Sequence, residues 1–80
     1  MADYHLWGVI RRPAGLDAYV VVITALPHPP SAGGELRVEM FSADTIAEAE
    51  SIRGNKLMEW GYEIRSRGYD SIVDVVDDDE

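Results

Sequence analysis

Residues Ala18 to Leu26 read AYVVVITAL, an apolar run that only Thr24 interrupts. The run has the length of a β-strand and is rich in β-branched side chains, which favour extended backbone. A strand that is apolar on both faces is typical of the centre of a sheet. We therefore predict that residues 18–26 form a central strand around which the rest of the chain is arranged.

A first strand precedes this run, and a tight turn joins the two. Residues 4–12 alternate in two sets, and both sets contain apolar side chains, as expected of another strand with two apolar faces. In the connection that follows, Pro13 fixes φ and Gly15 is free to adopt the positive φ of a type II turn. The sequence therefore predicts that these two strands pair in an antiparallel sense.

A third strand follows a long loop and is predicted to be half exposed. Residues 27–34 read PHPPSAGG, and prolines and glycines in this number are typical of a loop. Residues 35–41 then alternate, with charged side chains on one side. The apolar side consists of Leu36, Val38 and Met40, and we expect these residues to face the helix as part of the core.

A long helix is predicted to start near Thr45. Thr45 and Glu48 have the spacing of a capping box, and Gly68 suits the position that follows the end of a helix. At 100° per residue the apolar side chains form a stripe about 80° wide. The residues of this stripe that we assign to the core are Leu57, Trp60 and Ile64.

Arg53 falls in the same stripe and leaves two interpretations open. In a continuous helix, the apolar stem of Arg53 would lie along the sheet while its guanidinium reaches outward. Alternatively, the helix breaks at Gly54 and Asn55, although one glycine inside a helix costs only about 1 kcal/mol.

A last strand and an acidic tail complete the predicted order β-β-β-α-β. Residues 71–76 read SIVDVV, which favours a strand, and the like charges of residues 77–80 predict a disordered tail. We therefore predict an α+β fold of two layers: a three-stranded antiparallel meander, a fourth strand, and one long helix packed on one face. Residues 1–76 would form a single domain, and the sequence leaves open whether the fourth strand lies beside the first or the third.

Charge and composition exclude several classes of protein. The 80 residues include 15 acidic and 7 basic ones, a net charge of -8, which argues against a surface for nucleic-acid phosphates. The chain has no cysteine, so disulfides and thiolate metal sites are excluded. No apolar run approaches the roughly 18 residues of a membrane span, and the first residues do not resemble a leader peptide. We expect a soluble, cytoplasmic protein that binds neither nucleic acid nor membranes.

No group of residues indicates catalysis. The two histidines, His5 and His28, lack a third ligand at metal-binding spacing, and we interpret them as surface residues. Glu59 and Glu63 lie one helical turn apart and have basic neighbours, which favours salt bridges over acid and base catalysis. Neither a phosphate-binding loop nor a nucleophile elbow occurs. We therefore predict no catalytic residue, no metal site and no cofactor.

One helix can cover only one face of the sheet, so apolar residues of the first two strands would remain uncovered. The alternating sets are Leu6 and Ile10 against Trp7 and Val9, and Val20, Val22 and Leu26 against Tyr19, Val21 and Ile23. The sequence does not assign either set to the helix. Our predicted interface with a second copy or a protein partner consists of Trp7, Val9, Tyr19, Val21 and Ile23. Alternatively, the proline-rich loop folds over this face, or the sheet curls enough to bury it.

The start of the helix, Asp44-Thr45-Ile46-Ala47-Glu48-Ala49, resembles the HicB-type antitoxin domains. In that family an Asp-Thr-x-x-Glu-Ala stretch opens the helix of a β-β-β-α-β unit, so the resemblance implies the same layout of elements. The Pro-Gly that follows the family's second strand has no counterpart in Leu26-Pro27-His28. No functional residue is therefore transferred from the family.

These observations predict a small non-catalytic module for protein interaction or regulation. It would self-associate, as a homodimer, through the sheet face that the helix leaves uncovered. One alternative is a small-molecule-binding protein or enzyme accessory subunit with a cleft between loop 27–34 and the helix. Another is an acidic, antitoxin-like regulator of a basic partner.

Overall fold

The protein folds into one four-stranded sheet and one helix, in the predicted order. The structure is a computed structural model that describes residues 3–29, 31, 34–68 and 72–79, with residues 77–79 described by their backbone alone. The α+β fold with a single helix on the sheet is confirmed. The elements are β1 (Asp3–Arg11), β2 (Tyr19–His28), β3 (Arg37–Ala43), α1 (Ile46–Ser66) and β4 (Ile72–Asp79).

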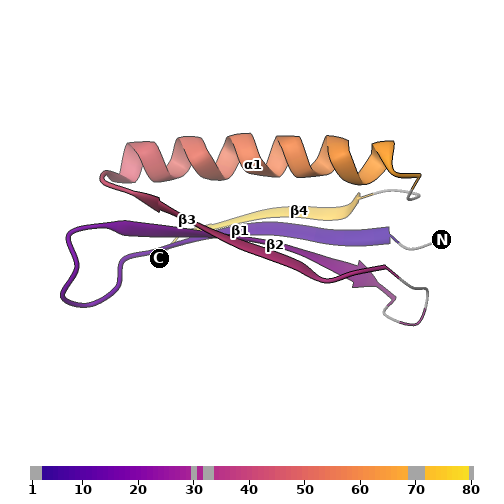
Figure 1. The fold of residues 1–80 in the computed structure, drawn as a ribbon, viewed down its shortest axis with the longest axis horizontal. Helices are drawn as coiled ribbons and strands as arrows, with labels where there is room; N and C mark the ends of the chain where they lie inside the picture. The colour runs from indigo at the N-terminus through magenta and orange to yellow at the C-terminus, as the bar shows by residue number, and fades with distance from the viewer. Residues whose placement is uncertain (1–2, 30, 32–33, 69–71, 80) are drawn as a thin grey trace.

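The apolar run of β2 lies inside the sheet, as its composition predicts. The strand order is β3-β2-β1-β4, so β2 pairs with β3 on one side and with β1 on the other (Figure 1). Both of these pairs are antiparallel, and β4 runs parallel to β1. The fourth strand therefore lies beside the first, which is the position that the sequence left open.

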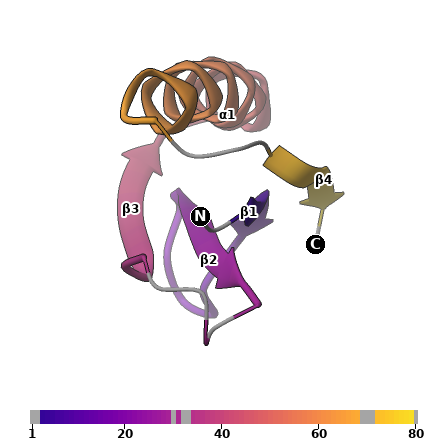
Figure 2. The same cartoon turned by 90° about the vertical axis from the view of Figure 1, so that its right-hand side faces the viewer.

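The sheet curls around the helix. Seen end-on, β3 and β4 rise on either side of α1, and β1 and β2 lie beneath it (Figure 2). The molecule measures 42 × 20 × 15 Å, and its radius of gyration is 13.4 Å. A compact 80-residue domain would have a radius near 11.6 Å. The larger value fits an elongated body of two layers, and among the described residues no third layer covers the far side of the sheet.

The structure confirms the predicted turn between β1 and β2 and the predicted ends of the helix. The Leu16 backbone N–H donates to the Pro13 carbonyl at 3.2 Å, and Gly15 has φ of 82°, as a type II turn requires. At the start of α1, the Glu48 backbone N–H donates to Thr45 Oγ1 at 3.1 Å. Gly68 follows the end of the helix with φ of 89°. The helix is continuous through Gly54, so the interpretation with a break is wrong.

The core lies between α1 and the concave face of the sheet. Leu6, Ile10, Val21 and Ile23 are fully buried there, and Trp60 is the largest side chain enclosed. Leu57 and Ile64 join the same cluster from the helix. Arg53 is also buried, with its stem over β1, because Gly8 has no side chain at that point: a Cβ on Gly8 would lie 2.6 Å from Arg53 Cγ.

The assignment of Leu36, Val38 and Met40 to the core is wrong. These residues are 60%, 47% and 70% exposed, and Leu36 precedes β3. Val38 and Met40 are paired with Thr24 and Val22, whose side chains point away from the helix. The opposite side of β3 packs toward α1 instead, with Phe41 and Ala43 against the core.

The predicted disordered tail is also corrected. The backbone of β4 continues through Asp79 and stays paired with β1, with Gly8 opposite Asp77 and Ile10 opposite Asp79. Inter-strand hydrogen bonds to β1 stabilise this extended backbone in spite of the repulsion between neighbouring acids. Glu80 lies outside the described residues.

Candidate interaction surface

The convex face of the sheet carries a continuous apolar surface, which we call the open face. The strand register shows which side chains lie in the middle of this face. Trp7 on β1 is paired with Thr24 on β2 and with Val76 on β4, and Thr24 is paired in turn with Val38 on β3. Cross-strand partners point to the same side of a sheet. One row of side chains therefore crosses all four strands without a charged residue.

A second row lies beside the first. Val9 is paired with Val22, and Val22 is paired with Met40, so three further apolar side chains extend the surface over β1, β2 and β3. On β4 this row ends at Asp78, which is paired with Val9. On the same side of β2, Leu26 lies next to the first row and Val20 lies next to the second row. The open face consists of Trp7, Val9, Val20, Val22, Thr24, Leu26, Val38, Met40 and Val76.

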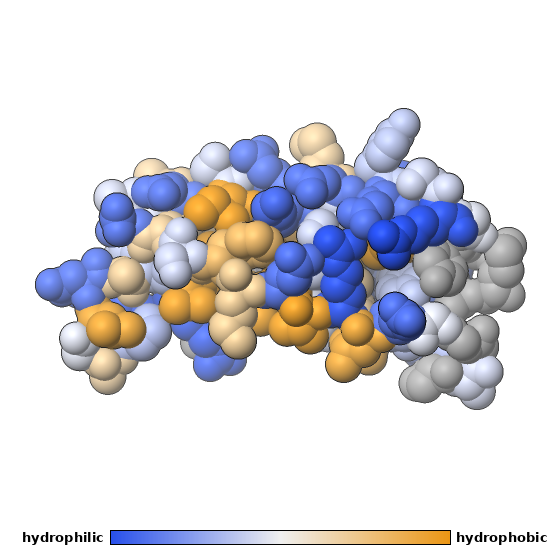
Figure 3. Space-filling view, viewed as in Figure 1, coloured by the Kyte–Doolittle hydropathy of each residue, from blue (hydrophilic) through white to orange (hydrophobic). Residues whose placement is uncertain are grey.

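Much of the open face is in contact with solvent. Met40, Val38, Leu26 and Val76 are exposed, and Trp7 and the valines of β1 and β2 are half-buried. In the space-filling view, hydrophobic side chains gather beneath the helix, whereas the helix above them is largely hydrophilic (Figure 3). The amphipathic division predicted for the helix therefore does not extend to the sheet, because both faces of the sheet are apolar.

The structure divides the predicted interface residues between the two faces. Trp7 and Val9 lie on the open face, as predicted. Tyr19, Val21 and Ile23 lie on the helix face, where Val21 and Ile23 are fully buried and Tyr19 packs against the core, so their assignment to the interface is wrong. The register selects the other alternating set of β2, Val20, Val22 and Leu26.

Polar and charged residues border the open face. His5 is paired with Leu26 and with Asp74, and the His5 and His28 rings pack edge to face, with centroids 4.7 Å apart and planes at 80°. Arg11 lies at the other end of β1. An apolar centre with a polar rim is the usual anatomy of a protein interface.

A small hollow lies between the helix and the end of the proline-rich loop, where the cleft for a small molecule was predicted. Its volume is 140 Å³, and its lining includes Tyr4, Leu36 and Ile64. Pockets that enclose drug-sized ligands have roughly 300–1,000 Å³. The hollow between the described residues is smaller than such pockets.

Ion pairs lie along the same hollow. Arg37 contacts Glu63 at 3.1 Å and Glu39 at 2.9 Å, and Glu63 also accepts a hydrogen bond from Arg67 at 2.9 Å. Partial burial lowers the pKa of Arg37, but the hydrogen bonds and charges of Glu39 and Glu63 outweigh this effect and raise the pKa above its ordinary value. These contacts join β3 to α1 and give the cluster a structural role.

Two further observations concern the part of the chain that the structure describes. Within it, no group of three or more histidine, cysteine or acidic side chains is placed to hold a metal ion. Its helix is also not apolar enough over a sufficient length to cross a membrane.

Comparison of the chain with protein-family models, with curated proteins and with solved structures finds no match.

The predicted interface contains two of the nine residues of the open face, Trp7 and Val9. The residues that it lacks come from β2, β3 and β4: Val20, Val22, Thr24, Leu26, Val38, Met40 and Val76. The available signal was the charged side of β3: if Arg37 and Glu39 flank the helix, the apolar side of the strand must point away from it.

Proposed function

We propose that this protein is a non-catalytic interaction module that forms a homodimer through the open face. The observation that carries the proposal is the register, which joins Trp7, Val9, Val22, Val38 and Met40 into one uncharged surface. Contiguous exposed apolar surface of this kind marks interaction sites in soluble proteins. A tryptophan and a methionine are also among the residue types enriched in interfaces.

The open face is close to the smallest area that a stable dimer needs. Four strands spaced about 4.8 Å apart, each contributing about 23 Å of length, give a footprint of roughly 450 Å². Side chains make the accessible surface larger than this footprint, so two copies would bury on the order of 1,000 Å² together. This area is close to the lower limit of about 1,000 Å² for a biological interface.

The apolar composition of the open face favours a second copy as the partner. A two-fold axis that lies between two copies brings the apolar rows of one open face onto those of the other. Such an isologous contact is the commonest way in which soluble proteins form dimers.

The test compares two methionines of similar exposure on opposite sides of the molecule. Met40, on the open face, is 70% exposed, and Met58, on the helix, is 76% exposed. Met40→Glu places a charge that must lose its hydration in the dimer, whereas Met58→Glu leaves its charge in water. Size-exclusion chromatography with light scattering should give a dimer for the wild type and for Met58→Glu, and a monomer for Met40→Glu.

The unfolding transition of each variant provides the control for folding. Both glutamate variants should unfold cooperatively, so that a change in mass reflects the interface alone. A monomeric wild type at high concentration, or equal masses for the two variants, would refute the proposed dimer.

A further inference from the structure

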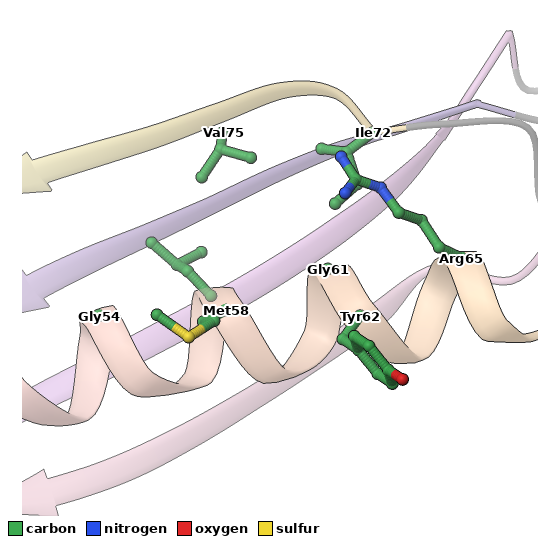
Figure 4. Close-up of a pocket in the computed structure, with 8 residues that line it drawn as sticks. Gly54, Met58, Gly61, Tyr62, Arg65, Ile72 and Val75 are labelled. Carbon is green, nitrogen blue, oxygen red and sulfur yellow. The ribbon is translucent and has the colours of Figure 1, made fainter.

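A second surface, separate from the open face, lies between the helix and the edge strand β4. An open groove of 440 Å³ runs between them. Val75 and Ile72 point toward the helix, and the side of the helix along the groove carries Met58 and Tyr62 (Figure 4). The volume lies in the range of ligand-binding pockets, but the groove is open along its length, as a site for an extended chain would be.

Two glycines shape the helix side of this groove. A Cβ on Gly61 would lie 2.7 Å from Ile72 Cδ1, so the missing side chain lets the start of β4 approach the helix closely. A Cβ on Gly54 would meet nothing within 4 Å, so the groove stays open at that end. From Gly54 to Arg65 the helix rises by about 16 Å, which equals the length of about five residues of extended chain.

The strand beside the groove has an unpaired edge and a strongly acidic sequence. β4 is the last strand in the sheet order, and within the described residues β1 is its only strand neighbour. Asp74, Asp77, Asp78 and Asp79 make up four of its eight residues. Arg65 is the one cation that lines the groove, and it extends toward Ile72 at the start of β4 (Figure 4).

This charge pattern selects the occupant of the groove. A second copy that paired antiparallel along the whole of its own β4 would bring Asp74 of each copy opposite Asp77 of the other, and like charges across a strand pair are destabilising. Acidic residues in an edge strand therefore oppose pairing between copies. The same charges attract a strand that carries lysine or arginine.

We propose that β4 and the groove bind an extended basic segment of a protein partner, which adds to the sheet as a fifth strand. Alternate side chains of the segment are apolar and enter the groove beside Met58 and Val75. The side chains between them are basic and lie on the side of Asp74. The groove lies on the helix side of β4, whereas Asp74 lies on the same side of β4 as Val76 of the open face.

The test uses a labelled seven-residue peptide in which valine and lysine alternate. Fluorescence anisotropy should show that it binds the wild type, and raising the salt concentration should weaken this binding because exposed charges are screened. Two control peptides replace either valine by serine or lysine by glutamate. Each control should bind at least about tenfold more weakly, since each loses one of the two recognition elements.

Gly54 provides a matched pair of protein variants. Gly54→Leu fills the open end of the groove and should weaken binding of the valine and lysine peptide at least about tenfold. Gly54→Ala places a single methyl group in open space and should bind as the wild type does. Both variants replace a helical glycine with a better helix former, so neither should lower the unfolding midpoint.

Hydrogen exchange locates the bound peptide. Amides of β4 should become protected when the peptide binds, and Met40→Glu should bind it as tightly as the wild type does. The proposal is overturned if the peptide does not bind, if Gly54→Leu binds it as well as Gly54→Ala does, or if protection appears away from β4. Loss of the dimer in Met40→Glu has no bearing on this result, so the two proposals fail separately.

Discussion

The guanidinium carbon of Arg37 lies 3.9 Å from the centre of the Trp60 ring, so a cation on β3 covers the largest buried side chain of the helix. The same guanidinium contacts Glu63 one turn further along α1. Arg37 therefore joins the strand to the helix through a cation–π contact and an ion pair. This arrangement also orients β3, because it directs Arg37 and Phe41 toward the helix and leaves Val38 and Met40 on the open face.

Arg37→Ala is expected to lower the free energy of unfolding by about 1–2 kcal/mol, because cation–π contacts at partly exposed sites contribute about 0.5–2 kcal/mol and the half-exposed ion pairs add little. Urea denaturation measures the change. Arg12→Ala is the control, since Arg12 makes a long contact of 3.9 Å with the exposed Asp17 and lies 5.9 Å from the centre of the Tyr19 ring. A loss for Arg12→Ala as large as that for Arg37→Ala would contradict this account.

Two glycine substitutions are expected to have opposite effects on stability. Gly8→Ala places a Cβ 2.6 Å from Arg53 Cγ and 3.0 Å from Ile23 Cδ1, and crowding of this kind in a core costs about 1–3 kcal/mol. Gly54→Ala meets no atom within 4 Å and should raise stability by up to about 1 kcal/mol through helix propensity. Thermal unfolding of both variants checks the signs. A neutral Gly8→Ala would show that Arg53 does not pack against β1 as described.

Neighbouring residues of β3 should respond differently to truncation. Phe41→Ala removes a side chain that packs against the core and should cost about 2–3 kcal/mol, whereas Met40→Ala should cost less than about 1 kcal/mol in dilute protein. Chemical denaturation at low protein concentration separates these effects from dimer formation. If Met40→Ala were the more damaging change, the orientation of β3 would be reversed.

Local sequence signals predicted the elements of this fold well. The capping residue Thr45, the turn glycine Gly15 and the terminal glycine Gly68 each act within a few residues, and each occupies the predicted position. The apolar composition of β2 likewise placed this strand inside the sheet. Signals of this kind depend on backbone geometry and short-range hydrogen bonds, which the sequence encodes directly.

The assignment of faces could not be predicted in the same way. Alternation divides each strand into two sets, but the set that meets the helix depends on contacts between distant residues, such as Arg37 with Trp60. A shift of one residue reverses every side chain in a strand, so the error at Val38 and Met40 follows from one wrong choice. The strand conformation of the aspartates in β4 could not be predicted for a similar reason. Pairing with β1 outweighs their low strand propensity, and this pairing joins residues that are distant in the sequence.

Sedimentation equilibrium of the wild-type protein tests the central claim, self-association through the open face, most directly. The chain has a mass of 8.9 kDa. Across a concentration series that reaches about 200 μM, we predict that the apparent mass rises toward twice this value, as mass action requires of a dimer. Trp7→Asp, at the centre of the open face, should keep the apparent mass at 8.9 kDa throughout the series. A wild-type protein that stays at 8.9 kDa at every concentration would contradict the account.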